Sequence, residues 1–187
     1  LVVTDPQRPT GCALIVVSAD GENSIVIAPG ANASDLWQDT LGRAIDGLSS
    51  EDVVLLQQEI PHDVTIAAIR GAHGKGARVV INMAPFAALP EDVVALVDPV
   101  IVNEHEALQL ADAGLMPAST VTTFGAEGVA WDGEQLPGLS VPGGKVLDTT
   151  GAGDAFCGAL CAALAQGADR AGALVAGQEA GAQAVQH

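Results

Sequence analysis

The sequence is poor in basic residues, and this shortage narrows the partners that it can have. Lysine and arginine together number 7 against 23 aspartates and glutamates, so the formal net charge is −16 over 187 residues. Proteins that bind nucleic acid or anionic membranes neutralise phosphates with lysine and arginine, so the composition argues against both partners. A phosphate-bearing ligand would need backbone N–H groups, a helix N-terminus or metal ions to balance its charge.

Cysteines are also few, and long apolar runs are missing. Cys12, Cys157 and Cys161 do not make the framework of a secreted disulfide scaffold. We interpret Cys157 and Cys161, four residues apart, as small buried residues, because no nearby histidine completes a zinc site.

No apolar stretch is long enough to predict a transmembrane helix. The beginning of the chain shows no signal-peptide pattern, so we expect a cytoplasmic protein.

The pattern of apolar residues predicts one α/β domain. Hydrophobic residues make up 49% of the chain, enough for one real core at this length. Two apolar runs around an Asp-Gly turn predict a hairpin within residues 10–28. Helix and strand patterns then alternate, which favours a parallel sheet with helices on both faces. We expect helices over about 34–48, 64–76, 89–97, 152–166 and 170–186, strands over 52–59 and 77–85, a strand running into a helix over 98–110, and two strands around a glycine turn over 119–132.

Polar residues follow several of the predicted strands. They include Glu59, Asn82, Asn103 and Thr123, and the polar stretch 148–154 precedes the first of the two last helices. Ligands of parallel α/β sheets bind beyond the carboxyl ends of the strands. The sequence therefore predicts a pocket at this edge of the sheet.

The glycine turn before that helix is the strongest local signal. Gly151, Ala152 and Gly153 can point successive N–H groups at an anion, and the positive end of the helix dipole adds to the attraction. Asp154 would lie beside that anion, where a carboxylate can take a proton from an attacking hydroxyl. The alternative is an aspartate that only stabilises the helix start. Asp148 and Thr150 could likewise bind an ion or only stabilise the turn.

Four stretches resemble one known family in order and spacing. Residues 148–156, D-T-T-G-A-G-D-A-F, resemble the second signature of the PfkB carbohydrate kinases, which have the ribokinase-like fold. Residues 102–106 resemble the family's N-x-x-E motif, and residues 123–128 resemble its T-x-G-x-x-G motif. Residues 10–33 are similar to the ribokinase branch in particular. The resemblance spans nearly the whole chain.

The resemblance implies a three-layer α/β/α sandwich with a mostly parallel central sheet and a small β lid, to which the 10–28 hairpin would belong. It implies that ATP phosphorylates the 5-hydroxyl of ribose. Asp154 would be the base and contact the sugar, Gly151, Ala152 and Gly153 would form the anion hole, and Glu59 would bind ribose.

The resemblance also assigns the nucleotide and the cations. Asn103, Thr123, Gly125 and Gly128 would bind the nucleotide. Glu106 would hold Mg²⁺ through water, which suits an ion that keeps its waters. Asp148 and Thr150 would bind a monovalent cation, K⁺. A homodimer is a further expectation, because lids of this fold often pair.

The chain also departs from the family pattern. The family's N-terminal half, with its G-G-x-x-N sugar motif, and the C-terminal strand region are not in residues 1–187, and only 16 residues separate Glu106 from Thr123. We therefore expect one domain without that half, and no useful kinase activity if these residues act alone. The alternatives are another PfkB kinase acting on a different sugar or a nucleoside, or a non-catalytic regulator that binds sugar or nucleotide.

Overall fold

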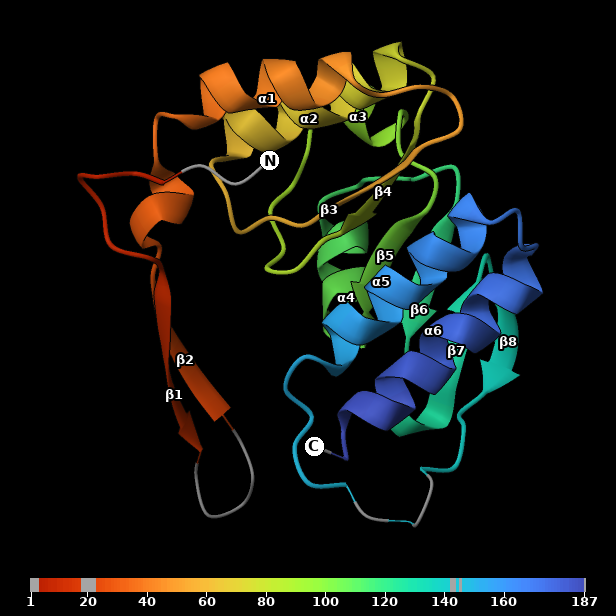
Figure 1. Cartoon of the computed structure of the whole chain (residues 1–187). Coiled ribbons are helices and arrows are strands. Elements are labelled where there is room, and N and C mark those ends of the chain that lie inside the picture. The colour runs from red at the N-terminus through yellow and green to blue at the C-terminus, as the bar shows by residue number, and fades with distance from the viewer. Residues whose placement is uncertain (1–3, 18–22, 142–143, 145, 187) are drawn as a thin grey trace.

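The centre of the molecule is a six-stranded sheet with the order β3-β4-β5-β6-β7-β8. The computed structural model describes residues 4–17, 23–141, 144 and 146–186 (Figure 1). Neighbouring strands run parallel from β3 to β6, and β7 runs antiparallel to both of its neighbours, β6 and β8. The strands are β3 (Val53–Leu56), β4 (Arg78–Asn82), β5 (Val100–Asn103), β6 (Thr120–Thr123), β7 (Gly128–Trp131) and β8 (Glu134–Pro137).

Helices cover both faces of this sheet. On one face lie α2 (His62–Gly74), α3 (Glu91–Val94) and α4 (Glu104–Asp112), with α1 (Trp37–Asp46) packed on α2; on the other lie α5 (Ala152–Ala165) and α6 (Arg170–Ala184). The alternation of side chains along β4 explains the two cores. Val79 and Ile81 pack with α2 and α3, whereas Val80 packs with α5. This arrangement confirms the predicted three-layer α/β/α sandwich.

A separate two-stranded hairpin precedes the sheet. Strands β1 (Cys12–Val17) and β2 (Asn23–Ala28) pair antiparallel within the predicted range 10–28, and the turn between them lies outside the described residues. Figure 1 shows the hairpin standing apart from the central sheet. Its apolar side chains are open to solvent, with Leu14 68%, Val26 65% and Ile27 56% exposed. Its assignment to a lid stays a prediction.

Two strands differ from the expectation. The predicted buried strand 52–59 is the shorter β3, and it lies at the sheet edge with Leu55 38% exposed. Strand β8 was not expected, because its short, polar sequence is not typical of a strand. It forms because Asp132 and Gly133, both with positive φ (50° and 87°), turn the chain back after β7. Asp-Gly is a strong signal for such a hairpin turn.

Helix boundaries also differ slightly. Helix α1 begins at Trp37 and ends at Asp46, and Ser34 contributes by accepting a hydrogen bond from the Leu36 N–H at 3.2 Å. Within the described ranges, no helix combines the length and apolar character needed to cross a bilayer.

Candidate active site

A cavity of about 290 Å³ opens between the β6–β7 loop and the start of α5. Five of the predicted site residues line it: Thr123, Gly125, Gly128, Ala152 and Gly153. Two motifs that lie about 25 residues apart in the sequence therefore share one cavity, which the sheet and α5 bring together. The remaining lining residues are Ala126, Val129, Gly138, Leu139, Val141, Val146, Thr149, Phe156, Gln178, Gly181, Ala182 and Val185.

The β6–β7 loop forms one wall of this cavity. Gly125 and Gly128 have φ values of 55° and 122°, which residues other than glycine rarely adopt. A Cβ on Gly128 would lie 2.1 Å from the Leu136 carbonyl oxygen, so β8 leaves no space for a side chain there. The Thr123 hydroxyl donates to the Val102 carbonyl at 3.4 Å, which ties the loop to β5. Both glycines are therefore needed to shape this wall.

The start of α5 forms the opposite wall. Gly151, with φ of 77°, is the N-cap residue, and no side chain accepts a hydrogen bond there. The Ala152 N–H donates to the Thr149 carbonyl at 3.2 Å. Within the described part of the chain, the N–H groups of Gly151, Gly153 and Asp154 have no acceptor. The predicted amide cluster is thus open to a ligand except at Ala152.

Helices α4 and α6 begin differently, whereas α1, α2 and α3 share with α5 the lack of a capping side chain. Asn103 caps α4 and Asp169 caps α6, each with a side chain that accepts a backbone N–H. Helix α5 lacks such a cap, so its free N–H groups and its positive dipole end remain available to an anion. An anion site at α5 suits a chain with so few basic residues.

Two carboxylates flank this helix start. Asp148 Oδ1 accepts the Thr150 N–H at 2.8 Å, and this bond is the main reason that the pKa of Asp148 is lowered. A bond from the Thr150 hydroxyl lowers the pKa further. Asp148 is therefore an ionised oxygen donor. Asp154 lies exposed in the first turn of α5, directly after Gly153. Four predicted site residues are next to cavity-lining residues in the sequence but do not line the cavity themselves: Asp148, Thr150, Gly151 and Asp154.

Asn103 and Glu106 meet in a reciprocal capping box at the start of α4. The Asn103 N–H donates to Glu106 Oε2 at 2.8 Å, and the Glu106 N–H donates to Asn103 Oδ1 at 2.8 Å. Burial raises the pKa of Glu106, and the bond from Asn103 opposes part of that rise. Glu106 also lies close enough to α5 for its charge to contribute to the raised pKa of Cys157. Neither Asn103 nor Glu106 is among the residues that line the cavity.

The remaining predicted residues take no part in the cavity. Glu59 is exposed beyond the end of β3. Cys157 and Cys161 are buried, which confirms their interpretation, and burial raises the pKa of these thiols to about 12 and about 11. Among the described residues, no three histidine, cysteine or acidic side chains gather as a metal site would require.

Several residues of the site escaped sequence reasoning. Leu139, Val141 and Val146 supply an apolar wall, and Gln178 and Ala182 of α6 complete it. Nothing in one sequence marks these positions, because apolar loop residues and an alanine-rich helix are common in any core. Gln178 Nε2 also donates to the Pro137 carbonyl at 3.0 Å and joins α6 to β8.

Comparison with known proteins agrees with this geometry. The chain is 34% identical to the ribokinase of Bacillus subtilis over 189 residues, which cover 92% of this chain and 63% of that protein. Its fold is similar to the ribokinase of Thermotoga maritima, with a TM-score of 0.78 and 30% identity over 96% of this chain and 64% of the other. It is also similar to the Arabidopsis thaliana ribokinase solved with ribose and ATP, with a TM-score of 0.77 and 26% identity over 96% and 64%.

The extent of the match is also informative. The chain spans less than two thirds of the length of these relatives. The family model of the pfkB carbohydrate kinases matches all of residues 1–187. The chain belongs to the pfkB family of carbohydrate kinases.

Proposed function

We propose that the protein is an ATP-dependent kinase that phosphorylates the 5-hydroxyl of ribose. The observation that supports this most is the shared cavity, in which the T-x-G-x-x-G loop faces the uncapped start of α5. The similarity to ribokinases, one of them solved with ribose and ATP, supports the choice of substrates. Because the chain spans less than two thirds of the length of these relatives, its activity and its substrates are stated as a proposal.

In this proposal the backbone carries most of the phosphate binding. The N–H groups of Gly151 and Gly153 hold the oxygens of the transferring phosphoryl group, and the Ala152 N–H serves mainly to hold the turn. Thr123, Gly125 and Gly128 contact the nucleotide from the other wall, with Asn103 beyond them. Fixed dipoles of this kind stabilise charge that develops during phosphoryl transfer.

Asp154 is the proposed base. Its carboxylate takes the proton of the ribose 5-hydroxyl while that oxygen bonds to the γ-phosphorus and the bond to ADP breaks. Asp154 also hydrogen-bonds the sugar, and Glu59 binds other ribose hydroxyls. Both carboxylates are exposed, so both are free to receive a substrate.

Two pairs of residues, Asn103 with Glu106 and Asp148 with Thr150, suit hard cations, because their oxygen atoms are the ligands that such ions prefer. One carboxylate oxygen of Glu106 accepts the Asn103 N–H, and the other would hold a hydrated Mg²⁺. Asp148, ionised, and Thr150 would hold K⁺. A bound Mg²⁺ neutralises charge on the phosphates.

We also propose that the hairpin pairs with a second copy of the protein. Pairing in register places Leu14 and Val26 on one face and Ala13 and Ile27 on the other, and apolar side chains are exposed on both. An isolated two-stranded hairpin with such faces is marginal in water, so a partner surface would stabilise it. Sedimentation that finds only monomers would contradict this part of the proposal.

Replacement of Asp154 by asparagine tests the catalytic proposal. Asp154→Asn should lower the rate of ribose-dependent ADP release by about 10²- to 10⁴-fold, the usual contribution of a general base. The affinity for ADP should stay unchanged, because the N–H groups remain. A variant that keeps full turnover would refute the role of Asp154. A wild-type protein that binds nucleotide but never turns over ribose would favour the non-catalytic regulator.

A further inference from the structure

The C-terminal end of α6, including its C-cap residue Val185, contacts the α5 start and the segment before it at two points. A Cβ on Gly181 would lie 3.3 Å from the Ala152 carbonyl oxygen, so the backbones of the two helices are nearly in contact. The Val185 carbonyl accepts the Leu147 N–H at 2.8 Å and the Asp148 N–H at 3.4 Å. Gly181 lies in the last turn of α6, and Val185, four residues farther on, caps the same face of the helix.

These two contacts enclose the glycine turn. Val185 holds the chain just before the turn, and Gly181 lies against Ala152 in the turn itself. The positions of the free Gly151 and Gly153 N–H groups thus depend on where the last turn of α6 lies. Both Gly181 and Val185 also line the cavity.

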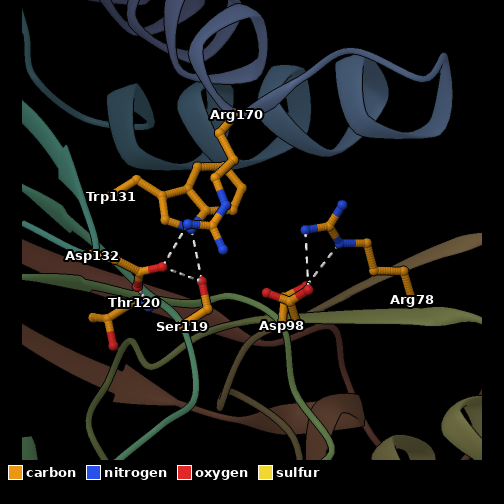
Figure 2. Close-up of polar contacts among 7 residues, drawn as sticks. All are labelled: Arg78, Asp98, Ser119, Thr120, Trp131, Asp132 and Arg170. Carbon is orange, nitrogen blue, oxygen red and sulfur yellow. Dashed lines mark hydrogen bonds and ion pairs between the residues drawn. The ribbon is translucent and has the colours of Figure 1, made fainter. Parts of the chain in front are cut away.

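The other end of α6 is fixed to the sheet, as Figure 2 shows. Arg170 Nη1 lies 2.7 Å from Asp132 Oδ2, and the guanidinium carbon lies 5.1 Å from the centroid of the Trp131 ring. Trp131 is 2% exposed, and its Nε1–H donates to Ser119 Oγ at 2.7 Å. Midway along α6, a Cβ on Gly177 would lie 2.8 Å from the Phe156 ring and 3.1 Å from the Phe156 carbonyl oxygen. A helix held at its start and in its middle can support the turn rigidly.

We propose that the last turn of α6 positions the amide cluster, and that Gly181 is a positioning residue for the phosphates of the nucleotide. This inference rests on the proposed function only in naming the ligand. A side chain at Gly181 would push the Ala152 carbonyl by a few tenths of an ångström, and the neighbouring N–H groups would move with it. Displacements near 1 Å can cost about 10²-fold in an enzyme, so a smaller shift should cost several-fold.

Three glycine variants separate positioning from packing. Gly181→Ala presses on the Ala152 carbonyl at the α5 start, and Gly177→Ala presses on the ring and the carbonyl of Phe156, one turn farther along α5. Gly158→Ala meets no atom within 4 Å. The measurement is the ratio of the affinities for ADP and adenosine, which isolates the contribution of the phosphates. Melting temperatures of all three variants report packing.

Gly181→Ala should lower the ADP-to-adenosine ratio about threefold to tenfold, in line with a shift of a fraction of an ångström. Gly177→Ala should lower the melting temperature and leave the ratio unchanged. Gly158→Ala should lower neither the melting temperature nor the ratio. An unchanged ratio in Gly181→Ala, or an equal fall in Gly177→Ala, would overturn the inference. A wild-type protein without ribose-dependent ADP release would instead refute the proposed function, while the ratio still decides the role of Gly181.

Discussion

Replacing Gly153 by alanine should make the protein more stable and a poorer binder of nucleotide. A Cβ on Gly153 meets no atom within 4 Å, and the residue lies in the first turn of α5. Alanine is favoured over glycine in a helix by about 0.5–1 kcal/mol, so the free energy of unfolding should rise. The same methyl group would project beside a cavity-lining N–H and obstruct an approaching phosphate. Loss of a hydrogen bond to a charged group costs about 1.5–3 kcal/mol, or about tenfold to a hundredfold in ADP affinity.

The assay combines urea unfolding with calorimetric titration of ADP. Gly158→Ala is the matched control, because it lies in the same helix, also meets no neighbouring atom and does not line the cavity. It should gain similar stability and keep wild-type affinity. If Gly153→Ala binds ADP as tightly as the wild type, phosphate does not approach this N–H group and the reasoning fails.

Two further predictions concern stability. Asp132 accepts the Thr120 N–H at 2.7 Å, pairs with Arg170 at 2.7 Å and has a φ of 50°. Asp132→Ala should therefore lower the free energy of unfolding in urea by about 3 kcal/mol, because the charge-assisted bond and the ion pair are lost and alanine tolerates the left-handed conformation less well than aspartate. A cost below about 1 kcal/mol would contradict this role. Burial raises the pKa of Glu106 above its ordinary 4.5, so its contribution to stability is full below pH 4.5 and is lost as the pH rises through the folded-state pKa. Glu106→Gln can still accept the Asn103 N–H, so its stability should vary less from pH 4.5 to pH 7 than that of the wild type; an identical pH dependence would refute this.

The sequence was a good guide to the layers of the fold. Alternation of strand and helix patterns is a local property, and it predicted the parallel sheet and the helices on both faces. Strand β8 was missed because the Asp132-Gly133 turn, rather than the residues of the strand, creates it. The edge position of β3 was missed because a run of apolar residues looks the same in an edge strand and in a buried one.

The candidate site was predictable where glycines impose a backbone shape. Gly125, Gly128 and Gly151 all have positive φ, and their spacing in the sequence indicated the two walls of the cavity. The part that α6 plays was not predictable, since the approach of Gly181 to Ala152 is a tertiary contact with no local signal. Likewise, the sequence could not show that the Ala152 N–H is used within the turn.

The central claim is that free N–H groups at the start of α5 bind the phosphates of a nucleotide. Titration of ¹⁵N-labelled protein with ADP, followed by amide resonances, tests it most directly. The claim predicts that the Gly153 and Asp154 resonances shift saturably while that of Gly158, deeper in the helix, stays in place. Binding of ADP that leaves the Gly153 and Asp154 resonances unmoved would contradict it.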